Sequence, residues 1–365
     1  MSGEVPDGWS SATLGDVIRL EYGRALSASA RAPGPIPVYG SNGVCGQHSV
    51  ALVNKRGIVV GRKGTAGSVT VTTGPFWPID TTYFVVPRVA ADFDWLAATL
   101  EHARLSELNE ATGVPGLNRD KAYVQPILVP PLEEQRRIAE VLRSVHDVLQ
   151  AADRARHAAN SVFRASLGEM LDGDAADWPK TRLGQVAEFI NGRGFKPHEW
   201  ESTGLPIIRI QNLNGGTEFN FYSGAYNPKI RVGTGELLFA WSGSRGTSFG
   251  PHIWKGPEGL LNYHTWKVVP TSKSDAQFLY FSLLRLTKQI EEEAHGASAL
   301  VHTQKANIVD YETGWPSREV RMEVASTLSE MENARSAANV TFEQARALRQ
   351  HIASDLLSGR VRVPA

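Results

Sequence analysis

The fold is decided by a stretch that occurs twice: residues 9–17, WSSATLGDV, return at residues 178–186 as WPKTRLGQV. The pair Gly23-Arg24 returns as Gly192-Arg193, at the same offset of 169 residues. Farther along, Val85-Val86-Pro87 matches Val268-Val269-Pro270. Leu171-Asp172-Gly173 then matches Leu357-Ser358-Gly359, and by this last match the offset has grown to 186. Because solenoid repeats are only about 20–50 residues long, this repeat predicts two similar domains. The second one carries about 17 extra residues in its middle.

Composition limits the class of protein. The 365 residues suffice for two or three domains, and 42% hydrophobic with 21% charged residues is ordinary for a globular protein. No apolar run approaches the ~20 residues that span a bilayer, and the N-terminus lacks the features of a signal peptide. The single cysteine, Cys45, cannot form an internal disulfide and, with His48, supplies too few ligands for zinc. We therefore expect a cytoplasmic protein with no membrane contact and no metal.

Net charge gives no general support for nucleic-acid binding. The chain has 38 Lys and Arg against 38 Asp and Glu, so its formal net charge is zero. A DNA-binding surface would therefore need cations that cluster locally, with the acids elsewhere.

The pattern along the chain predicts two α+β domains and two long helices. In residues 1–130, the runs 57–61, 68–72 and 81–86 have the composition of strands between turns, and 94–104 that of a helix. Residues 176–315 repeat this style, with strands predicted at 205–210, 235–241 and 265–270 and a helix from 275 to about 294. The two long helices are expected within residues 131–175 and 316–365, and prolines stand where each of them starts.

Each long helix carries an apolar stripe. In the first, residues spaced by three and four form a heptad seam, typical of a coiled coil: Ile138, Val141, Val145, Val148, Ala152, Ala155, Ala159 and Val162. The stripe of the second helix is Val324, Leu328, Met331, Ala338, Phe342, Ala345, Ile352 and Leu356. A helix of ~37 residues is ~55 Å long. We expect the two helices to pair antiparallel through these stripes; the alternative is that each lies on its own domain.

The sequence contains no catalytic motif. In Gly61-Arg62-Lys63-Gly64 the lysine precedes the second glycine, so this is not a nucleotide-binding phosphate loop. Asp80 is followed by no acid-x-Lys pair that would complete a nuclease centre, and Glu291-Glu292-Glu293 is typical of a solvated helix face. We expect no catalytic residue.

Glycine-punctuated loops supply the candidate DNA contacts. In the first domain these are Ser41, Asn42, Lys55, Arg62, Lys63 and Thr65; in the second they are Arg209, Gln211, Asn212, Asn214, Ser242, Ser244, Arg245 and Thr247. Arg suits guanine and Asn or Gln suits adenine, whereas Lys, Ser and Thr more often hold phosphates. Residues 242–248 have the place in the second domain that 62–67 have in the first. For each Asn or Ser, the alternative is a turn residue that bonds its own backbone.

With these residues identified, the chain resembles the specificity subunit of type I restriction-modification systems. The resemblance rests on the start of each repeat, on residues 60–67 (VGRKGTAG), on 206–213 (PIIRIQNL) and on 130–142 (PPLEEQRRIAEVL), and covers residues 9 to about 359. It implies an α+β, pseudo-twofold architecture with two target-recognition domains, residues 1–130 and 176–315. Two long spacer helices, residues 131–175 and 316–365, would join them as an antiparallel coiled coil.

The resemblance also implies a function. Each target-recognition domain would read one half of a bipartite site in double-stranded DNA, and the chain itself would be no enzyme and bind no cofactor. Methyltransferase subunits carrying S-adenosylmethionine would dock on it, and a restriction subunit would complete the complex. The docking residues implied are Leu132, Glu133, Gln135, Arg136 and Ile138. Residues 317–323 (SREVRME) depart from this pattern, so we expect docking chiefly at the first helix.

Two rival functions are considered. One is a self-contained DNA methyltransferase or nuclease with an unrecognised site, against which the missing motifs argue. The other is a two-lobed, lectin-like adhesin, which the lack of an export signal disfavours.

Overall fold

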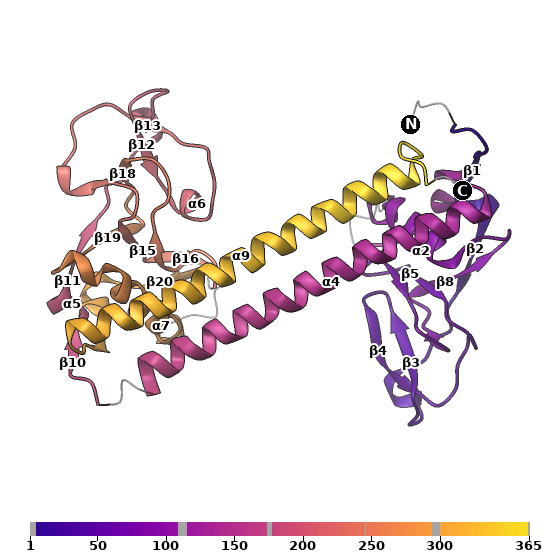
Figure 1. Cartoon of the computed structure of the whole chain (residues 1–365), viewed down its shortest axis with the longest axis horizontal. Coiled ribbons are helices and arrows are strands. Elements are labelled where there is room, and N and C mark those ends of the chain that lie inside the picture. Colours follow the sequence, from indigo (N-terminus) through magenta and orange to yellow (C-terminus); the bar gives the residue numbers. More distant parts are fainter. Residues whose placement is uncertain (1–4, 109–114, 174–176, 245, 294–299, 364–365) are drawn as a thin grey trace. The chain divides into compact units, whose positions relative to one another are not determined.

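The computed structural model describes residues 5–108, 115–173, 177–244, 246–293 and 300–363. Contacts divide the chain into two units, residues 1–154 with 340–365 and residues 155–339. Both units are α+β, and both contain one segment of each long helix, α4 (Leu132–Gly168) and α9 (Arg318–Leu357) (Figure 1). Within the described residues, no helix combines the length and apolar character needed to span a membrane.

The first unit is built around an antiparallel sheet of four strands. Their order is β2 (Ile18–Tyr22), β8 (Thr82–Pro87), β5 (Ile58–Gly61) and β6 (Val69–Val71). A second sheet holds β4 (Gly43–His48), β3 (Ile36–Gly40) and β7 (Trp77–Pro78), and β1 (Ser10–Thr13) pairs with β9 (Pro126–Val129). The short helices are α1 (Leu14–Val17), α2 (Phe93–His102) and α3 (Arg119–Tyr123).

Helix α2 anchors the core of the first unit. It begins where the Asp92 carboxylate accepts hydrogen bonds from the backbone N–H groups of Asp94 and Trp95, both at 3.0 Å. Trp95 is fully buried and shares one cluster with Leu20 of the sheet, Ile138 of α4 and Leu356 of α9. Burial of each such side chain contributes about 1.5–3 kcal/mol, so the sheet, α2 and the long-helix segments stabilise one another.

The second unit repeats this plan with more strands. Its main sheet runs β11 (Ala187–Asn191), β19 (Thr265–Pro270), β15 (Leu237–Ala240) and β17 (Gly250–Ile253). A second sheet runs β13 (Phe221–Tyr222), β12 (Leu205–Ile208), β18 (Gly259–Leu261) and β14 (Arg231–Val232). Two strand pairs are β10 (Lys180–Arg182) with β21 (Glu312–Gly314) and β16 (Ser242–Ser244) with β20 (Leu300–His302). The helices are α5 (Leu183–Val186), α6 (Ile210–Leu213), α7 (Ala276–Glu293) and α8 (Lys305–Ile308).

The sequence repeat is also a repeat of single hydrogen bonds. Strands β2 and β8 pair from Ile18 opposite Pro87, and β11 and β19 pair from Ala187 opposite Pro270. Equivalent backbone bonds close both units: Leu14 N–H donates to the Gln125 carbonyl and Leu183 N–H to the Tyr311 carbonyl, each at 2.9 Å. The prediction of a duplicated α+β fold is confirmed.

The second sheet is where the second unit is larger. Its residues form a separate core that includes Ile207, Ile208, Leu260 and Leu261, all 0% exposed. The second sheet of the first unit contributes to a much smaller cluster of buried residues, Tyr39, Val59 and Phe76. Extra residues in the second copy have therefore formed additional core rather than only longer loops.

The segments of α4 and α9 pack antiparallel within each unit. In the first unit, Leu142 near the start of α4 shares a core with Leu356 near the end of α9. In the second unit, Phe163 near the end of α4 shares a core with Val324 and Leu328 near the start of α9. The expectation of an antiparallel pair is confirmed, and all eight residues of the predicted α9 stripe are buried or half-buried.

The seam predicted for α4 is wrong at several positions. Val148 and Val162 are 57% and 55% exposed, and Ala155 is also exposed. The inward positions are instead the adjacent Leu149 and Phe163, in register with Leu142. Both registers fit spacings of three and four, and the helix turns its larger apolar side chains inward because they bury more surface than Val or Ala.

One buried polar side chain locks the start of each long helix. In the first unit, the Gln135 amide donates to the Pro130 carbonyl at 2.9 Å and accepts from the Asp92 N–H at 2.8 Å. In the second unit, Arg321 replaces it.

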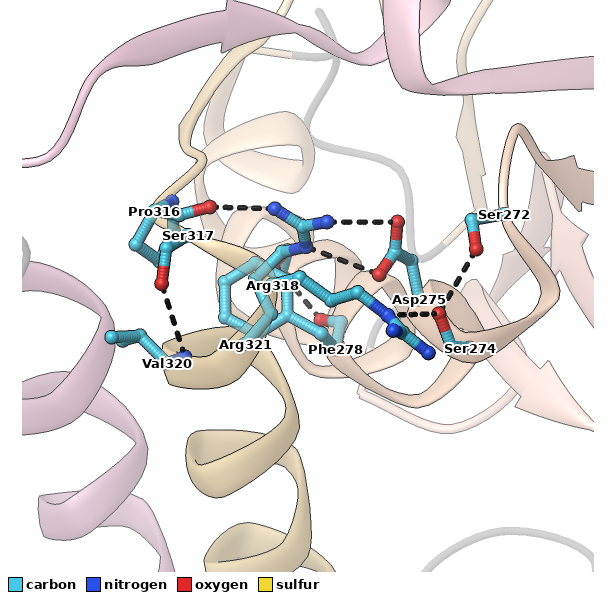
Figure 2. Close-up of polar contacts among 10 residues, drawn as sticks. Ser272, Ser274, Asp275, Phe278, Pro316, Ser317, Arg318, Val320 and Arg321 are labelled. Carbon is cyan, nitrogen blue, oxygen red and sulfur yellow. Dashed lines mark hydrogen bonds and ion pairs between the residues drawn. The ribbon is translucent and has the colours of Figure 1, made fainter.

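The Arg321 guanidinium donates to the Pro316 carbonyl at 2.5 Å and to both carboxylate oxygens of Asp275 at 3.1 and 3.2 Å (Figure 2). The side chains of Arg321 and Asp275 are only 12% and 4% exposed. Residues 317–323 thus differ in sequence from the first repeat but keep its attachment to the preceding proline.

The first unit also binds together segments from distant parts of the chain. Glu134 on α4 accepts two hydrogen bonds from Arg362, at 2.7 and 2.8 Å, and one from the Trp9 indole at 2.8 Å. The Arg362 guanidinium also donates to the Asp7 carbonyl at 3.0 Å. Hydrogen bonds from Arg362 are the main reason that the pKa of Glu134 lies below its ordinary value.

We predict that Arg321→Ala destabilises the protein by about 3–5 kcal/mol, because it leaves the Asp275 carboxylate buried without its partner. The measurement is the free energy of unfolding in denaturant. Arg231→Ala is the control, since its pair with Glu258 is about half exposed on both sides and should contribute about 0–1 kcal/mol. Equal losses in the two variants would contradict the assigned role.

We also predict that Glu134 contributes to the pH dependence of stability. Because its folded-state pKa is lowered, it stabilises the fold above the ordinary value of 4.5, and this contribution is lost as the pH falls through the folded pKa. Glu134→Gln should therefore show a smaller drop in unfolding free energy between pH 7 and acid than the parent chain. Glu133→Gln, an exposed position in the same turn, should keep the full drop.

Candidate nucleic-acid interface

In the first unit, two of the predicted loops meet over one short segment, Ile79–Thr81, which we call the first linking segment. The Arg62 and Lys63 N–H groups donate to the Thr81 carbonyl at 2.9 and 3.1 Å, and the Ser41 hydroxyl donates to the same oxygen at 2.6 Å. The structure thereby brings four candidates together around one concavity of about 350 Å³: Ser41, Asn42, Lys63 and Thr65.

A glycine makes this arrangement possible. Gly67 has a φ of +78°, and a Cβ there would lie 2.2 Å from the backbone nitrogen of Ser106. Only glycine combines this backbone conformation with such a close approach. The loop that presents Lys63 and Thr65 is therefore held against the body of the unit by backbone contacts.

Arg62 faces a neighbouring concavity, of about 360 Å³, that the sequence did not reveal. Its guanidinium lies 5.0 Å from the ring centroid of Tyr22, and Arg119 lies 5.2 Å from the same ring. Tyr83, whose pKa is raised chiefly by burial, lies beside Tyr22 with ring centroids 5.1 Å apart. Sequence reasoning missed Arg119 because this residue lies far from the glycine-rich loops along the chain. A signal that could have found it is the basic residue at the equivalent position of the second repeat, Lys305, since α3 begins at Arg119 and α8 at Lys305.

Lys55 does not join this group. It is exposed and precedes β5, whereas Arg62 follows β5, so the two lie at opposite ends of a strand that is ~13 Å long. Its neighbour Arg56 forms an ion pair with Asp94 at 2.8 Å, at the start of α2.

The second unit has an equivalent linking segment, Asn262–His264. The Asn262 N–H donates to the Ile208 carbonyl at 3.0 Å, as the Ile79 N–H donates to the Tyr39 carbonyl at 2.9 Å. The Trp241 N–H donates to the His264 carbonyl at 3.2 Å, in the manner of Arg62 and Thr81. The loops after β5 and β15 are therefore equivalent, but the predicted register is wrong by one residue: Trp241, not Ser242, has the place of Arg62.

The loop after β12 divides its candidates into exposed and buried residues. Gln211 and Asn214 are exposed, and the half-buried Arg209 lies 5.3 Å from the Trp200 ring. Asn212 is 5% exposed, and its amide donates to the Gly216 and Glu218 carbonyls at 3.1 and 2.9 Å. Asn212 thus bonds its own loop, which is the alternative considered for such residues.

The loop after β15 follows the same division. Ser242 is 6% exposed, whereas Ser244 and Thr247 are exposed. Arg245 lies outside the described residues. Burial, and to a lesser extent nearby His302, lowers the pKa of His264, so its imidazole is neutral at neutral pH.

The repeated Gly-Arg pair also belongs to this surface, although sequence reasoning assigned it no role. A Cβ on Gly23 would lie 2.1 Å from the Ile79 carbonyl oxygen, and one on Gly192 would lie 2.1 Å from that of Asn262. The following N–H groups, of Arg24 and Arg193, donate to the Pro78 and Leu261 carbonyls, each at 2.9 Å. Each unit therefore uses the same backbone frame around its linking segment.

Comparison with known families agrees with this duplicated frame. Residues 6–155 and 175–339 match the family described as "Type I restriction modification DNA specificity domain". The chain belongs to this family. It is a DNA specificity subunit of a type I restriction-modification system, and it is itself non-catalytic.

A curated relative and two solved structures are also similar to the chain. The chain is 21% identical over 297 residues to the type I restriction enzyme MjaVIII specificity subunit of Methanocaldococcus jannaschii, over 72% of this chain and 68% of that one. The S subunit of M. genitalium has the same fold, with a TM-score of 0.68 at 14% identity, over 98% and 97% of the two chains. A second solved structure, described for complex assembly of the type I R-M system, has a TM-score of 0.57 at 14% identity. The match covers 99% of this chain and 100% of that one.

In this specificity subunit, the residues implied for partner docking divide by exposure. Leu132, Glu133 and Arg136 are exposed at the start of α4, whereas Gln135 and Ile138 are 2% and 0% exposed. Gln135 is already used in the helix attachment described above. Of the residues predicted to dock a partner, these two therefore have no side chain available, and the other three do. Among the described residues, no three His, Cys, Asp or Glu side chains come together as metal ligands would.

We predict that Gly192→Ala disturbs the second unit's recognition surface, because its Cβ would collide with the Asn262 carbonyl. The specificity subunit should bind DNA more weakly, and the change should be confined to one half of its target. Gly194→Ala is a matched control, since its Cβ would meet nothing closer than 3.8 Å. Binding titrations against targets altered in either half provide the measurement; a Gly192→Ala variant with normal binding would count against the assigned frame.

Proposed function

We propose that each unit reads one half of a bipartite DNA site. The observation that carries this proposal is the duplicated frame: the same backbone bonds hold loops around Ile79–Thr81 and around Asn262–His264. The frame repeats, but the side chains on it do not. A protein with two equivalent scaffolds and two different sets of polar side chains is suited to reading two different short sequences.

The exposed side chains match the groups presented by DNA. In the first unit, the exposed Asn42 can read adenine while the exposed Lys63 and Thr65 hold phosphates. The buried Ser41 supports its loop through the hydrogen bond to Thr81. In the second unit, Arg209 suits guanine, and Gln211 and Asn214 suit adenine. The buried Asn212 and Ser242 support their loops instead of contacting bases. Lys55 and Arg245 remain candidates for DNA contact.

We further propose that this chain works inside a larger complex. Methyltransferase subunits, which bring S-adenosylmethionine, would dock on the exposed Leu132, Glu133 and Arg136, and a restriction subunit would complete the assembly. The helices α4 and α9 each contribute to both units, so they are suited to fix the spacing between half-sites. The residue ranges 1–130 and 176–315 serve as target-recognition domains and 131–175 and 316–365 as spacers. The complex acts in the cytoplasm.

The test uses the chain assembled with its methyltransferase partner and sequencing of methylated genomic sites. Asn42→Ala should reduce the base specificity in one half-site. The double variant Gln211→Ala with Asn214→Ala should reduce the base specificity in the other half-site. Loss of a bidentate base contact costs roughly 1–3 kcal/mol of discrimination. Gln289→Ala removes an exposed amide on α7 and should leave both half-sites unchanged. If either loop variant alters both halves, the two-reader assignment is wrong.

A further inference from the structure

The neutral net charge of the chain conceals an uneven distribution of paired charges. In the first unit, many arginines are compensated by carboxylates: Arg19 by Glu21, Arg56 and Arg143 by Asp94, Arg104 by Glu107, Arg349 by Glu101 and Arg362 by Glu134. Arg62, Lys63 and Arg119 differ from these. No carboxylate among the described residues lies within ion-pair distance of any of the three, although all three line one concavity.

The concavity is organised around the ring of Tyr22, which is 50% exposed. Arg62 and Arg119 both lie over this ring. Arg62 is positioned by a hydrogen bond of 2.9 Å to the Asp80 carbonyl, and Arg119 by one of 3.5 Å to the Leu20 carbonyl. The Arg119 Nε–H is buried and has no acceptor. The two guanidinium groups are thus held in place, and one of their donors has no partner within the protein.

The chemistry of the site selects an anion with several acceptor oxygens. Two guanidinium groups and an ammonium offer only donors, and such groups bind phosphate oxygens by charge-assisted hydrogen bonds. A base edge in the major groove presents a mixture of donors and acceptors, which three cations do not complement. Asp120 is the one carboxylate that lines the concavity, and it opposes an anion there.

The second unit lacks this group at the equivalent positions. Asn191 lies opposite Trp266 as Tyr22 lies opposite Tyr83. The Trp241 backbone carbonyl accepts from the Thr303 N–H at 3.0 Å, as the Arg62 backbone carbonyl accepts from the Leu117 N–H at 2.9 Å. Ser242 lies opposite His302 where Lys63 lies opposite Gly116. Lys305 alone remains basic, in the place of Arg119.

We infer that Arg62, Lys63 and Arg119 form a binding site for a phosphate of the DNA backbone, and that this site exists in the first unit only. The inference rests on the proposed function, because it assumes that this surface meets DNA. The inference also assigns different roles to the two units. The first unit anchors the duplex electrostatically, and it carries more of the salt sensitivity of binding than the second.

The experiment measures the dissociation constant of the assembled methyltransferase complex for a bipartite duplex between 50 and 200 mM salt. Arg119→Ala should weaken binding equally for all target sequences and reduce the slope of log K against log salt by about 0.9, the value for one phosphate contact. A four-fold rise in salt should then weaken the variant about 3.5-fold less than the parent. Arg119→Lys should restore most of the slope, which separates lost charge from misfolding.

Three further variants sharpen the result. Arg56→Ala removes the same charge from a compensated arginine at the other end of β5 and should leave the slope unchanged. Lys305→Ala, at the equivalent position of the second unit, should change the slope less than Arg119→Ala. Asp120→Asn should have the opposite sign and tighten binding.

Several results would overturn the inference. If Arg119→Ala changes the base specificity rather than the slope of log K against log salt, Arg119 contacts a base and not a phosphate. An unchanged slope would remove the phosphate site, and an equal effect of Lys305→Ala would remove the asymmetry. The proposed function fails separately: if Arg119→Ala lowers the slope while Asn42→Ala and the Gln211 and Asn214 variant leave both half-sites intact, the phosphate site stands and the two-reader assignment falls.

Discussion

The attachment of each long helix to its unit depends on one buried polar side chain at the helix start. Gln135 and Arg321 both satisfy the carbonyl of a proline that precedes the long helix. Each also bonds the residue just before an earlier helix of the core: Asp92 before α2 and Asp275 before α7. Leaving these buried groups unpaired would cost more than the hydrogen bonds themselves contribute. The attachment therefore holds the start of each long helix against α2 or α7. These two helices share their cores with β5 and β15, the strands that precede the recognition loops.

The two units solve this requirement with different chemistry. The first uses a neutral amide against a backbone N–H, and the second uses an ion pair between Arg321 and Asp275. Equivalent positions can therefore exchange residue type as long as donors and acceptors remain matched. The same rule holds at the recognition surface, where backbone bonds repeat around the linking segments while Arg62 and Trp241 differ completely. Such a scaffold separates what must stay constant for folding from what can change for recognition.

Much of the fold could be predicted from sequence because it depends on local pattern. The repeat, the strands between turns and the two long helices all follow from periodicity and turn residues. The register of α4 did not follow, because Val148 and Leu149 both satisfy a spacing of three and four and only packing distinguishes them. At the site, the loops were found from their glycines, but the inward position of Asn212 and the approach of Arg119 to Tyr22 depend on tertiary contacts. The resemblance implies partner docking for Gln135, whose side chain is buried, because a motif does not reveal which of its side chains point inward.

The first unit is discontinuous in the chain, whereas the second is not. Residues 155–339 contain every segment of the second unit, but the first needs residues 340–365, which supply Leu356 and Leu357 to its core. During synthesis, the second unit can complete its core while the first still lacks Leu356 and Leu357. Domains usually fold in the order in which they are made. Here the sheet of the first unit is made before the second unit but completes its core after it, so part of its apolar surface stays uncovered while the second unit folds.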